Sequence, residues 1–74
     1  MPDTFSYEVL ESFGTLSEAE NGWQKELTMV RWNDREPKYD IRIWSPRKER
    51  MGRGVTFSKE ELITLKSILN QIQL

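Results

Sequence analysis

The chain has 74 residues, contains neither cysteine nor histidine, and carries a formal net charge of −1. The missing cysteine excludes disulfides and thiolate metal sites, and the missing histidine removes the commonest metal ligand and the usual general base. A chain this short is near the lower limit for burying its own core, so we expect one domain over residues 1–74 that is stabilised by oligomerisation.

The N-terminal part of the chain predicts two strands joined by a tight turn. Apolar and polar residues alternate over 5–9, and an irregular apolar pattern continues to residue 16, where Gly14 suggests a bulge or a bend. The polar stretch 17–22 ends in Asn-Gly, a strong reversal signal because both residues tolerate positive φ. A second strand is expected over 23–32. Both of its faces mix polar and apolar residues, so the pattern does not decide which one is buried.

The third strand has the clearest alternation. It places Tyr39, Ile41 and Ile43 on one face, which we expect to be the core. The opposite face is expected to be polar, basic and exposed, and it holds Lys38, Asp40, Arg42 and Trp44. Residues 45–53 read as a basic loop, and 54–57 as a short fourth strand.

The C-terminus predicts a helix with a defined start. Ser58-Lys59-Glu60-Glu61 fits a capping box with Ser58 as the N-cap and Glu61 at the third helical position. Helical spacing then gathers the apolar residues into one stripe that we expect to cover the sheet: Leu62, Leu65, Ile68, Leu69 and Ile72. Ile63 and Leu74 lie off the stripe, which fits either a partner helix or simple exposure at the surface.

The residue inventory argues against catalysis. No serine is flanked by glycines as in a nucleophile motif, and Gly52-Arg53-Gly54 is too short and precedes a strand rather than the helix of a phosphate-binding loop. Asp34, Glu36 and Asp40 could in principle hold a hard cation, but ordinary turn and surface carboxylates explain them better. We therefore expect no enzyme activity, no metal, no cofactor and no small-molecule substrate.

The distribution of charge and aromatic residues points instead to a polyanion. Residues 1–22 carry five acidic side chains and no basic one, whereas 23–56 carry nine basic against five acidic side chains. Charges this widely spaced also suit an ordinary solvated surface. Single strands are held by cations along their backbone and by rings that stack on unpaired bases. Lys38, Arg42 and Trp44 supply both on one strand face.

Two segments form a recognisable pattern: Tyr39-Asp40-Ile41-Arg42-Ile43-Trp44 and, after a Pro-containing loop, Met51-Gly52-Arg53-Gly54-Val55-Thr56-Phe57-Ser58-Lys59-Glu60-Glu61. In their order and spacing, these segments resemble the positive cofactor 4 family of transcriptional coactivators. The bacterial branch is more similar still, through Gly22-Trp23 and the stretch 32–39, so the resemblance covers roughly residues 22–70. The tryptophan follows the Asp-Ile-Arg triplet one residue sooner than in the eukaryotic pattern.

The resemblance implies an α+β fold, a curved four-stranded antiparallel sheet followed by one helix (ββββα), assembled as a homodimer. It also implies binding of single-stranded DNA and melted duplex with little sequence preference, in transcription regulation or single-strand protection. Arg42 and Trp44 match the family pattern best, Lys38 and Arg53 match its basic positions, and Lys25 and Arg31 align loosely.

The expected nucleic-acid contacts are Lys25, Arg31, Lys38, Arg42, Trp44, Lys48 and Arg53. The expected dimer contacts are Ile63, Leu69 and Ile72. Single-stranded RNA is an alternative ligand, and a protein-interaction module that uses the sheet or helix surface is an alternative function. No apolar run is long enough to span a bilayer, and no signal peptide is recognisable, so we expect a cytoplasmic protein with no membrane partner.

Overall fold

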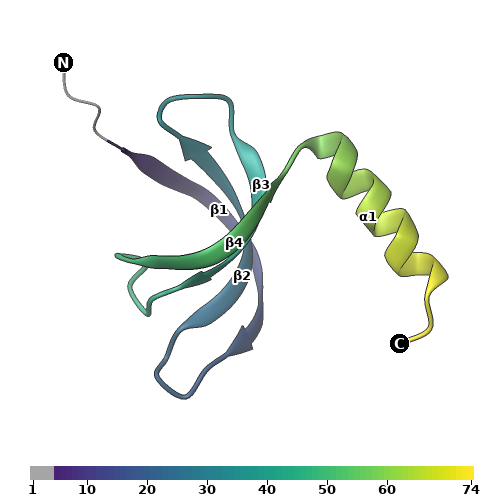
Figure 1. Cartoon of the computed structure of the whole chain (residues 1–74), viewed down its shortest axis with the longest axis horizontal. Coiled ribbons are helices and arrows are strands. Elements are labelled where there is room, and N and C mark those ends of the chain that lie inside the picture. Colours follow the sequence, from purple (N-terminus) through teal and green to yellow (C-terminus); the bar gives the residue numbers. More distant parts are fainter. Residues whose placement is uncertain (1–4) are drawn as a thin grey trace.

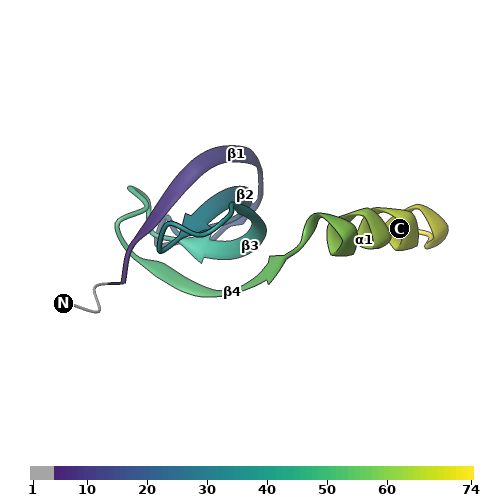
Figure 2. The same ribbon diagram turned by 90° about the horizontal axis from the view of Figure 1, so that it is seen from above.

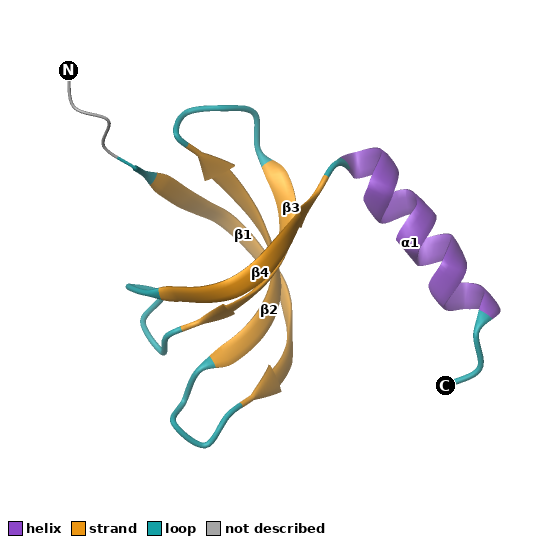
Figure 3. Cartoon of the chain, in the orientation of Figure 1, coloured by secondary structure: helices purple, strands orange, loops and turns teal. Residues whose placement is uncertain are grey.

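The computed structural model describes residues 5–74, which form a four-stranded antiparallel sheet followed by one helix (Figures 1 and 3). The strands lie in the sheet in sequence order. The elements are β1 (Tyr7–Glu18), β2 (Gln24–Trp32), β3 (Lys38–Trp44), β4 (Met51–Phe57) and α1 (Lys59–Gln71). The expected ββββα architecture is confirmed. Strand β4 begins three residues earlier than the predicted 54, so the preceding loop is shorter than expected.

Residues with positive φ form the turns between the strands. In the β1–β2 turn the N–H of Gly22 donates to the carbonyl of Ala19 at 3.0 Å, and Gly22 has a φ of 91°. Asn21 keeps a negative φ and uses its side-chain oxygen to accept a backbone hydrogen bond instead. The β2–β3 turn has positive φ at both Asn33 and Asp34, the pattern of a type I′ turn, whose twist matches that of the flanking strands.

The sheet is strongly curved (Figure 2). Trp44 on β3 pairs with Gln24, which lies eight residues from Trp32 along β2. On a flat sheet this spacing would separate the two tryptophans by about 26 Å. Both rings nevertheless lie close to the ring of Tyr7, with centroids 5.6 Å away for Trp44 and 6.0 Å away for Trp32. The curvature therefore brings the two ends of the sheet together over its concave face.

This curvature decides which face is buried, and the faces differ from the prediction. The fully buried side chains all lie on the concave face: Trp44, Val30, Thr28 and Asp40. The residues expected in the core, Tyr39, Ile41 and Ile43, lie on the convex face and are only half-buried. The prediction was wrong because an apolar alternation identifies the two faces but does not show which one the sheet curls around.

Strand β1 follows the curve through three bulges. Its register with β2 shifts between Val9 and Glu11, between Ser12 and Gly14, and between Thr15 and Ser17. The extra residue at each shift is apolar: Leu10, Phe13 and Leu16. A bulge bends a strand and raises its twist, and three in succession explain why the apolar residues of β1 recur every third position.

Helix α1 begins as predicted but does not cover the sheet. Ser58 Oγ accepts the N–H of Glu61 at 3.1 Å and a Glu61 side-chain oxygen accepts the N–H of Ser58 at 2.8 Å, which completes the capping box. In this helix, all of which the structure describes, no residue is buried. Leu62 and Leu65 are half-buried, whereas Leu69 is 46% exposed. The expected apolar stripe therefore lacks a complete partner surface within one chain.

Candidate nucleic-acid interface

Four aromatic rings form a continuous cluster on the concave face, here called the aromatic cluster: Phe5, Tyr7, Trp32 and Trp44. Neighbouring ring centroids lie 5.6 to 6.1 Å apart and the ring planes are tilted by 34° to 43°. Exposure rises along the cluster, from Trp44 at 0% to Phe5 at 59%. Phe5 is thus the member that presents most ring surface to solvent.

Strand β1 is held over this face at both ends of the cluster. The N–H of Ser6 donates to the Asn33 side chain at 2.7 Å, and the N–H of Asn33 donates back to the Ser6 carbonyl at 2.9 Å. The hydroxyl of Tyr7 donates to the carbonyl of Lys48 at 3.0 Å. These bonds fix the start of β1 against the β2–β3 turn and the β3–β4 loop, so the rings are ordered before any ligand arrives.

Arg42 extends the aromatic cluster with a positive charge. Its guanidinium carbon lies 4.9 Å from the Trp32 ring centroid, within the range of a cation–π contact. Its Nε and Nη2 donate to the two carboxylate oxygens of Asp40 at 3.0 and 3.1 Å, a bidentate ion pair. Asp40 also accepts the hydroxyl of Thr56 at 2.9 Å, and Arg42 donates to the Gly52 carbonyl at 3.4 Å. Arg42 is therefore fixed in the protein, with a side chain 17% exposed.

Lys48 is also engaged within the protein. Its Nζ pairs with Glu26 Oε2 at 3.1 Å, and the side chain of Glu26 is 4% exposed. The hydroxyl of Ser12 donates to the other oxygen of Glu26 at 3.0 Å. The Lys48–Glu26 pair ties the β3–β4 loop to the sheet and neutralises a buried carboxylate, so it has a structural role.

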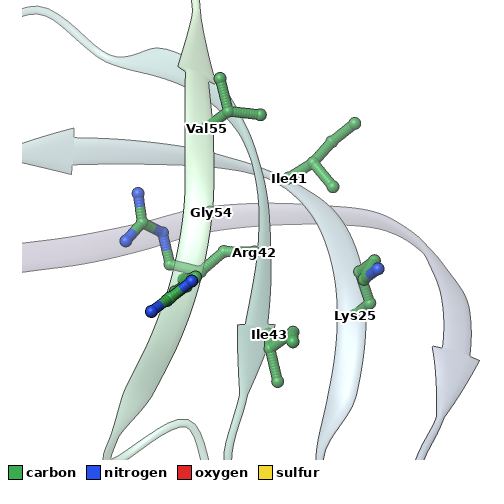
Figure 4. Close-up of a pocket in the computed structure, with 7 residues that line it drawn as sticks. Lys25, Ile41, Arg42, Ile43, Gly54 and Val55 are labelled. Carbon is green, nitrogen blue, oxygen red and sulfur yellow. The ribbon is translucent and has the colours of Figure 1, made fainter.

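The remaining predicted cations lie on two different faces. Lys38 pairs with Val30 on the concave side and is exposed, and within the described residues it makes no ion pair. Lys25 and Arg53 line a groove of about 360 Å³ on the convex side, between Ile43 and Val55 (Figure 4). Arg31, whose side chain is 40% exposed, forms an ion pair at 3.2 Å with Glu8 on the neighbouring strand β1. The seven predicted contacts therefore do not form one surface.

Phe5, Tyr7 and Trp32 are cluster members that the sequence prediction missed. The alternation over 5–9 identified a strand but gave no sign that its inward rings would reach Trp44. Arg35, at the β2–β3 turn beside Trp32, was also missed; it is exposed and free of ion pairs within residues 5–74. The concave side thus combines a partly exposed ring system with the free Lys38 at its edge, and the free Arg35 lies in the adjoining β2–β3 turn.

The predicted dimer contacts lie on the opposite side of the sheet. Leu69 lines an apolar groove of about 560 Å³ between α1 and the convex face. Ile63 lies beside Tyr39 in a smaller groove, and Ile63 and Ile72 are 57% and 47% exposed. The other residues of the large groove are Leu16, Leu27, Ile41, Leu62, Leu65, Lys66 and Asn70.

Two further observations bear on the kind of site. Among residues 5–74, no group of three or more acidic side chains is arranged to hold a metal ion. In the same residues no helix has the length and apolar character needed to cross a membrane.

Comparison with known proteins identifies the family of this chain. The family described as Transcriptional Coactivator p15 (PC4) matches residues 19–68. An uncharacterized protein of Treponema pallidum (strain Nichols) is 50% identical over 72 residues, which cover 97% of this chain and 85% of that protein. PC4 proteins are a non-enzymatic family of nucleic-acid-binding coactivators. The match includes β2, β3, β4 and most of α1, and it confirms the resemblance inferred from the sequence. The chain belongs to the PC4 family of transcriptional coactivators.

Proposed function

We propose that the protein is a homodimer that binds single-stranded DNA with little sequence preference, in transcription regulation or in the protection of opened DNA. Residues 1–74 act as one binding unit in the cytoplasm, without catalytic activity, metal or cofactor. The observation that carries the proposal is the concave aromatic cluster, which places an exposed ring and free cations at one edge of the sheet. Family membership supports a nucleic-acid ligand.

The ligand contacts in this proposal are Phe5, Trp32, Arg35 and Lys38. Unpaired bases stack on Phe5 and on the accessible part of Trp32, and Arg35 and Lys38 pair with phosphates. Arg42 contacts Trp32 and so orients its ring, while its charge is balanced by Asp40. Such contacts depend on ring faces and phosphates, which all nucleotides share, so they give little sequence preference.

Dimerisation is supported by the small apolar core of a single chain and by its large accessible surface. Among residues 5–74 only Val30 and Trp44 are apolar and fully buried. The accessible surface of 5971 Å² exceeds by about 1,200 Å² the value expected for a monomer of 8.8 kDa. Obligate homodimer interfaces bury about 1,000–2,500 Å² per partner, so a second copy on the convex face would be large enough to cover this excess.

Two exposed substitutions test the binding face without removing core residues. Phe5→Ala deletes a base-stacking ring, and its loss should weaken binding of a twenty-nucleotide strand by about 1–3 kcal/mol. Lys38→Ala should lower the slope of log affinity against log salt concentration by about 0.7 for each phosphate lost. Fluorescence anisotropy at several salt concentrations measures both effects.

Matched controls lie at the two ends of helix α1, away from the aromatic cluster. Leu74→Ala removes an apolar side chain that is 104% exposed beyond the end of α1, and Lys59→Ala removes an exposed charge from the start of α1. Both should bind as wild type does. If the wild-type protein binds no single strand at low salt, the protein-interaction alternative replaces this proposal. An RNA strand of the same sequence that binds more tightly than DNA would reassign the ligand.

A further inference from the structure

A second aromatic and basic site lies away from the aromatic cluster, where the β1–β2 turn meets the β3–β4 loop. It is a cavity of about 290 Å³ lined by Trp23, Ser45, Pro46, Arg47, Glu49 and Arg50. This set, here called the loop site, contains none of the predicted nucleic-acid contacts. Small-molecule pockets start at about 300 Å³, so the loop site has room for one ligand unit rather than a long segment.

The two sides of the loop site are packed against each other. A Cβ atom on Gly22 would lie 3.1 Å from Cγ of Pro46, which is tighter than ordinary contact. The turn and the loop can therefore approach this closely only because residue 22 has no side chain. On the turn side, the N–H of Trp23 donates to the Asn21 side chain at 3.0 Å, and the carbonyl of Trp23 accepts the N–H of Ala19 at 2.7 Å. The backbone of Trp23 is thereby fixed at the cavity.

The loop side is fixed by Ser45. Its N–H donates to the carbonyl of Arg50 at 3.0 Å, its hydroxyl oxygen accepts the N–H of Arg50 at 3.0 Å, and its carbonyl accepts the N–H of Lys48 at 2.8 Å. The ion pair between Lys48 and Glu26 then anchors the loop to the sheet. The loop is therefore ordered without using the side chains of Arg47 and Arg50.

The side chains that do not help to order the turn and the loop are of the types that recognise nucleotides in other proteins. Arg47 and Arg50 are exposed and make no ion pair within the described part of the chain. Trp23 is half-buried, in contrast to the fully buried Trp44, so part of its indole is open to the cavity. Indole rings stack on bases, and guanidinium groups bind phosphate oxygens with two parallel hydrogen bonds.

We propose that the loop site binds one nucleotide of a single strand, with the base against Trp23 and the adjoining phosphates against Arg47 and Arg50. The inference rests on the proposed function, because it adds a contact to a strand that the aromatic cluster also holds. Carboxylates accept hydrogen bonds from exocyclic amino groups such as that of cytosine, which thymine lacks, and the exposed Glu49 lines the same cavity. At this one position we expect cytosine to be favoured over thymine, within a strand that is otherwise held with little sequence preference.

The test measures binding of fluorescent twenty-nucleotide dC and dT strands to the full chain. Trp23→Ala should weaken binding roughly 5- to 150-fold, the loss of one base stack. Arg47→Ala and Arg50→Ala should each lower the salt slope by about 0.7 for each phosphate lost. Glu49→Gln keeps the shape of the side chain but removes its charge, and it should reduce the preference for dC over dT. Lys59→Ala is the matched charge control and should change neither quantity.

A spectroscopic measurement keeps the proposal testable if Trp23→Ala fails to fold. With 5-fluorotryptophan incorporated, the chain has three fluorine resonances, and Trp23→Phe identifies the signal of Trp23 by its disappearance. That signal should shift on saturation with the strand. The proposed function fails if the wild-type protein binds no strand at all. The loop site alone is refuted if wild type binds but the Trp23 signal stays in place and the two arginine variants bind as wild type does.

Discussion

The guanidinium of Arg42 lies 4.9 Å from the ring centroid of Trp32, although the two residues are far apart in the strand register. Arg42 reaches this position because the sheet curls around its concave face. One side of the guanidinium plane contacts the indole and its edge is bound to Asp40. Substitution of Arg42 therefore changes the stability of the fold and any ligand contact together. A variant at this position cannot distinguish an effect on folding from an effect on binding.

The first prediction concerns the counter-ion of Arg42. Asp40→Asn removes the carboxylate from a side chain that is 0% exposed and leaves the guanidinium without its charge partner. Breaking a buried pair in this way typically costs about 3–5 kcal/mol. Urea denaturation should show a lower midpoint, and near-ultraviolet circular dichroism should show a weaker tryptophan signal.

The exposed pair of Arg31 and Glu8 provides the comparison. Its side chains are 40% and 64% exposed, and exposed pairs contribute about 0–1 kcal/mol. Glu8→Gln should therefore leave the urea midpoint nearly unchanged. Equal effects of Glu8→Gln and Asp40→Asn would mean that the buried pair does not stabilise the concave face.

The second prediction compares two glycines. A Cβ at Gly54 would lie 2.6 Å from both Cβ of Arg42 and the carbonyl oxygen of Ile41, which no real side chain tolerates. Gly54→Ala should therefore force β3 and β4 apart and destabilise the protein by about 1–3 kcal/mol or more. Thermal unfolding, followed by far-ultraviolet circular dichroism, measures the loss.

Gly14→Ala is the matched control. In the described structure no atom outside its chain neighbours lies within 4 Å of a Cβ at Gly14, and its φ is not positive. Alanine there should be neutral or should stabilise by up to about 1 kcal/mol, because it restricts the unfolded chain. A Gly54→Ala variant as stable as Gly14→Ala would contradict the close approach of β4 to Arg42.

The sequence predicted the elements more reliably than their faces. Local chemistry determines the capping box at Ser58 and the reversal at Gly22, and both were correct. The burial of Asp40 depends on Arg42 and Thr56, partners that no short pattern relates to one another. The face of Ile41 looked like a core because it is apolar, yet in one chain the curvature buries the opposite, partly charged face. The strand at the N-terminus and the bulge at Gly14 were predicted, whereas the two further bulges of β1 were not, because a period of three in the apolar residues does not by itself indicate a bulged strand.

The third prediction concerns Trp44, which was expected to stack on bases. Its side chain is 0% exposed and packs against Tyr7, so in this structure its ring has no surface open to a base. Trp44→Ala should destabilise the chain by about 3–5 kcal/mol through the cavity it leaves. Trp44→Phe should cost less, and at a temperature where it is folded it should bind the twenty-nucleotide strand within about twofold of wild type. A large loss of affinity in folded Trp44→Phe would show that the indole contacts the ligand.

The last prediction concerns assembly through the convex face. Helix α1 has 13 residues and none of them is buried, although isolated helices of this length are marginal in water. Leu69 is 46% exposed in the groove between α1 and the sheet, so Leu69→Glu should leave one chain intact but place a charge in the proposed interface. Burial of a leucine contributes about 1.5–3 kcal/mol, and a twofold dimer contains the residue twice. The dimer dissociation constant should therefore rise roughly 10²- to 10⁴-fold.

Sedimentation velocity over a range of concentrations measures this change directly, because the two species differ twofold in mass. Leu74→Glu is the matched control, since Leu74 is 104% exposed and lies beyond the end of α1. It should sediment as wild type does, as a dimer. The convex-face dimer is contradicted if wild type is monomeric at micromolar concentration, or if Leu69→Glu and Leu74→Glu sediment alike. In a true convex-face dimer the helix signal at 222 nm should also weaken with dissociation, because α1 loses the surface that its apolar stripe packs against.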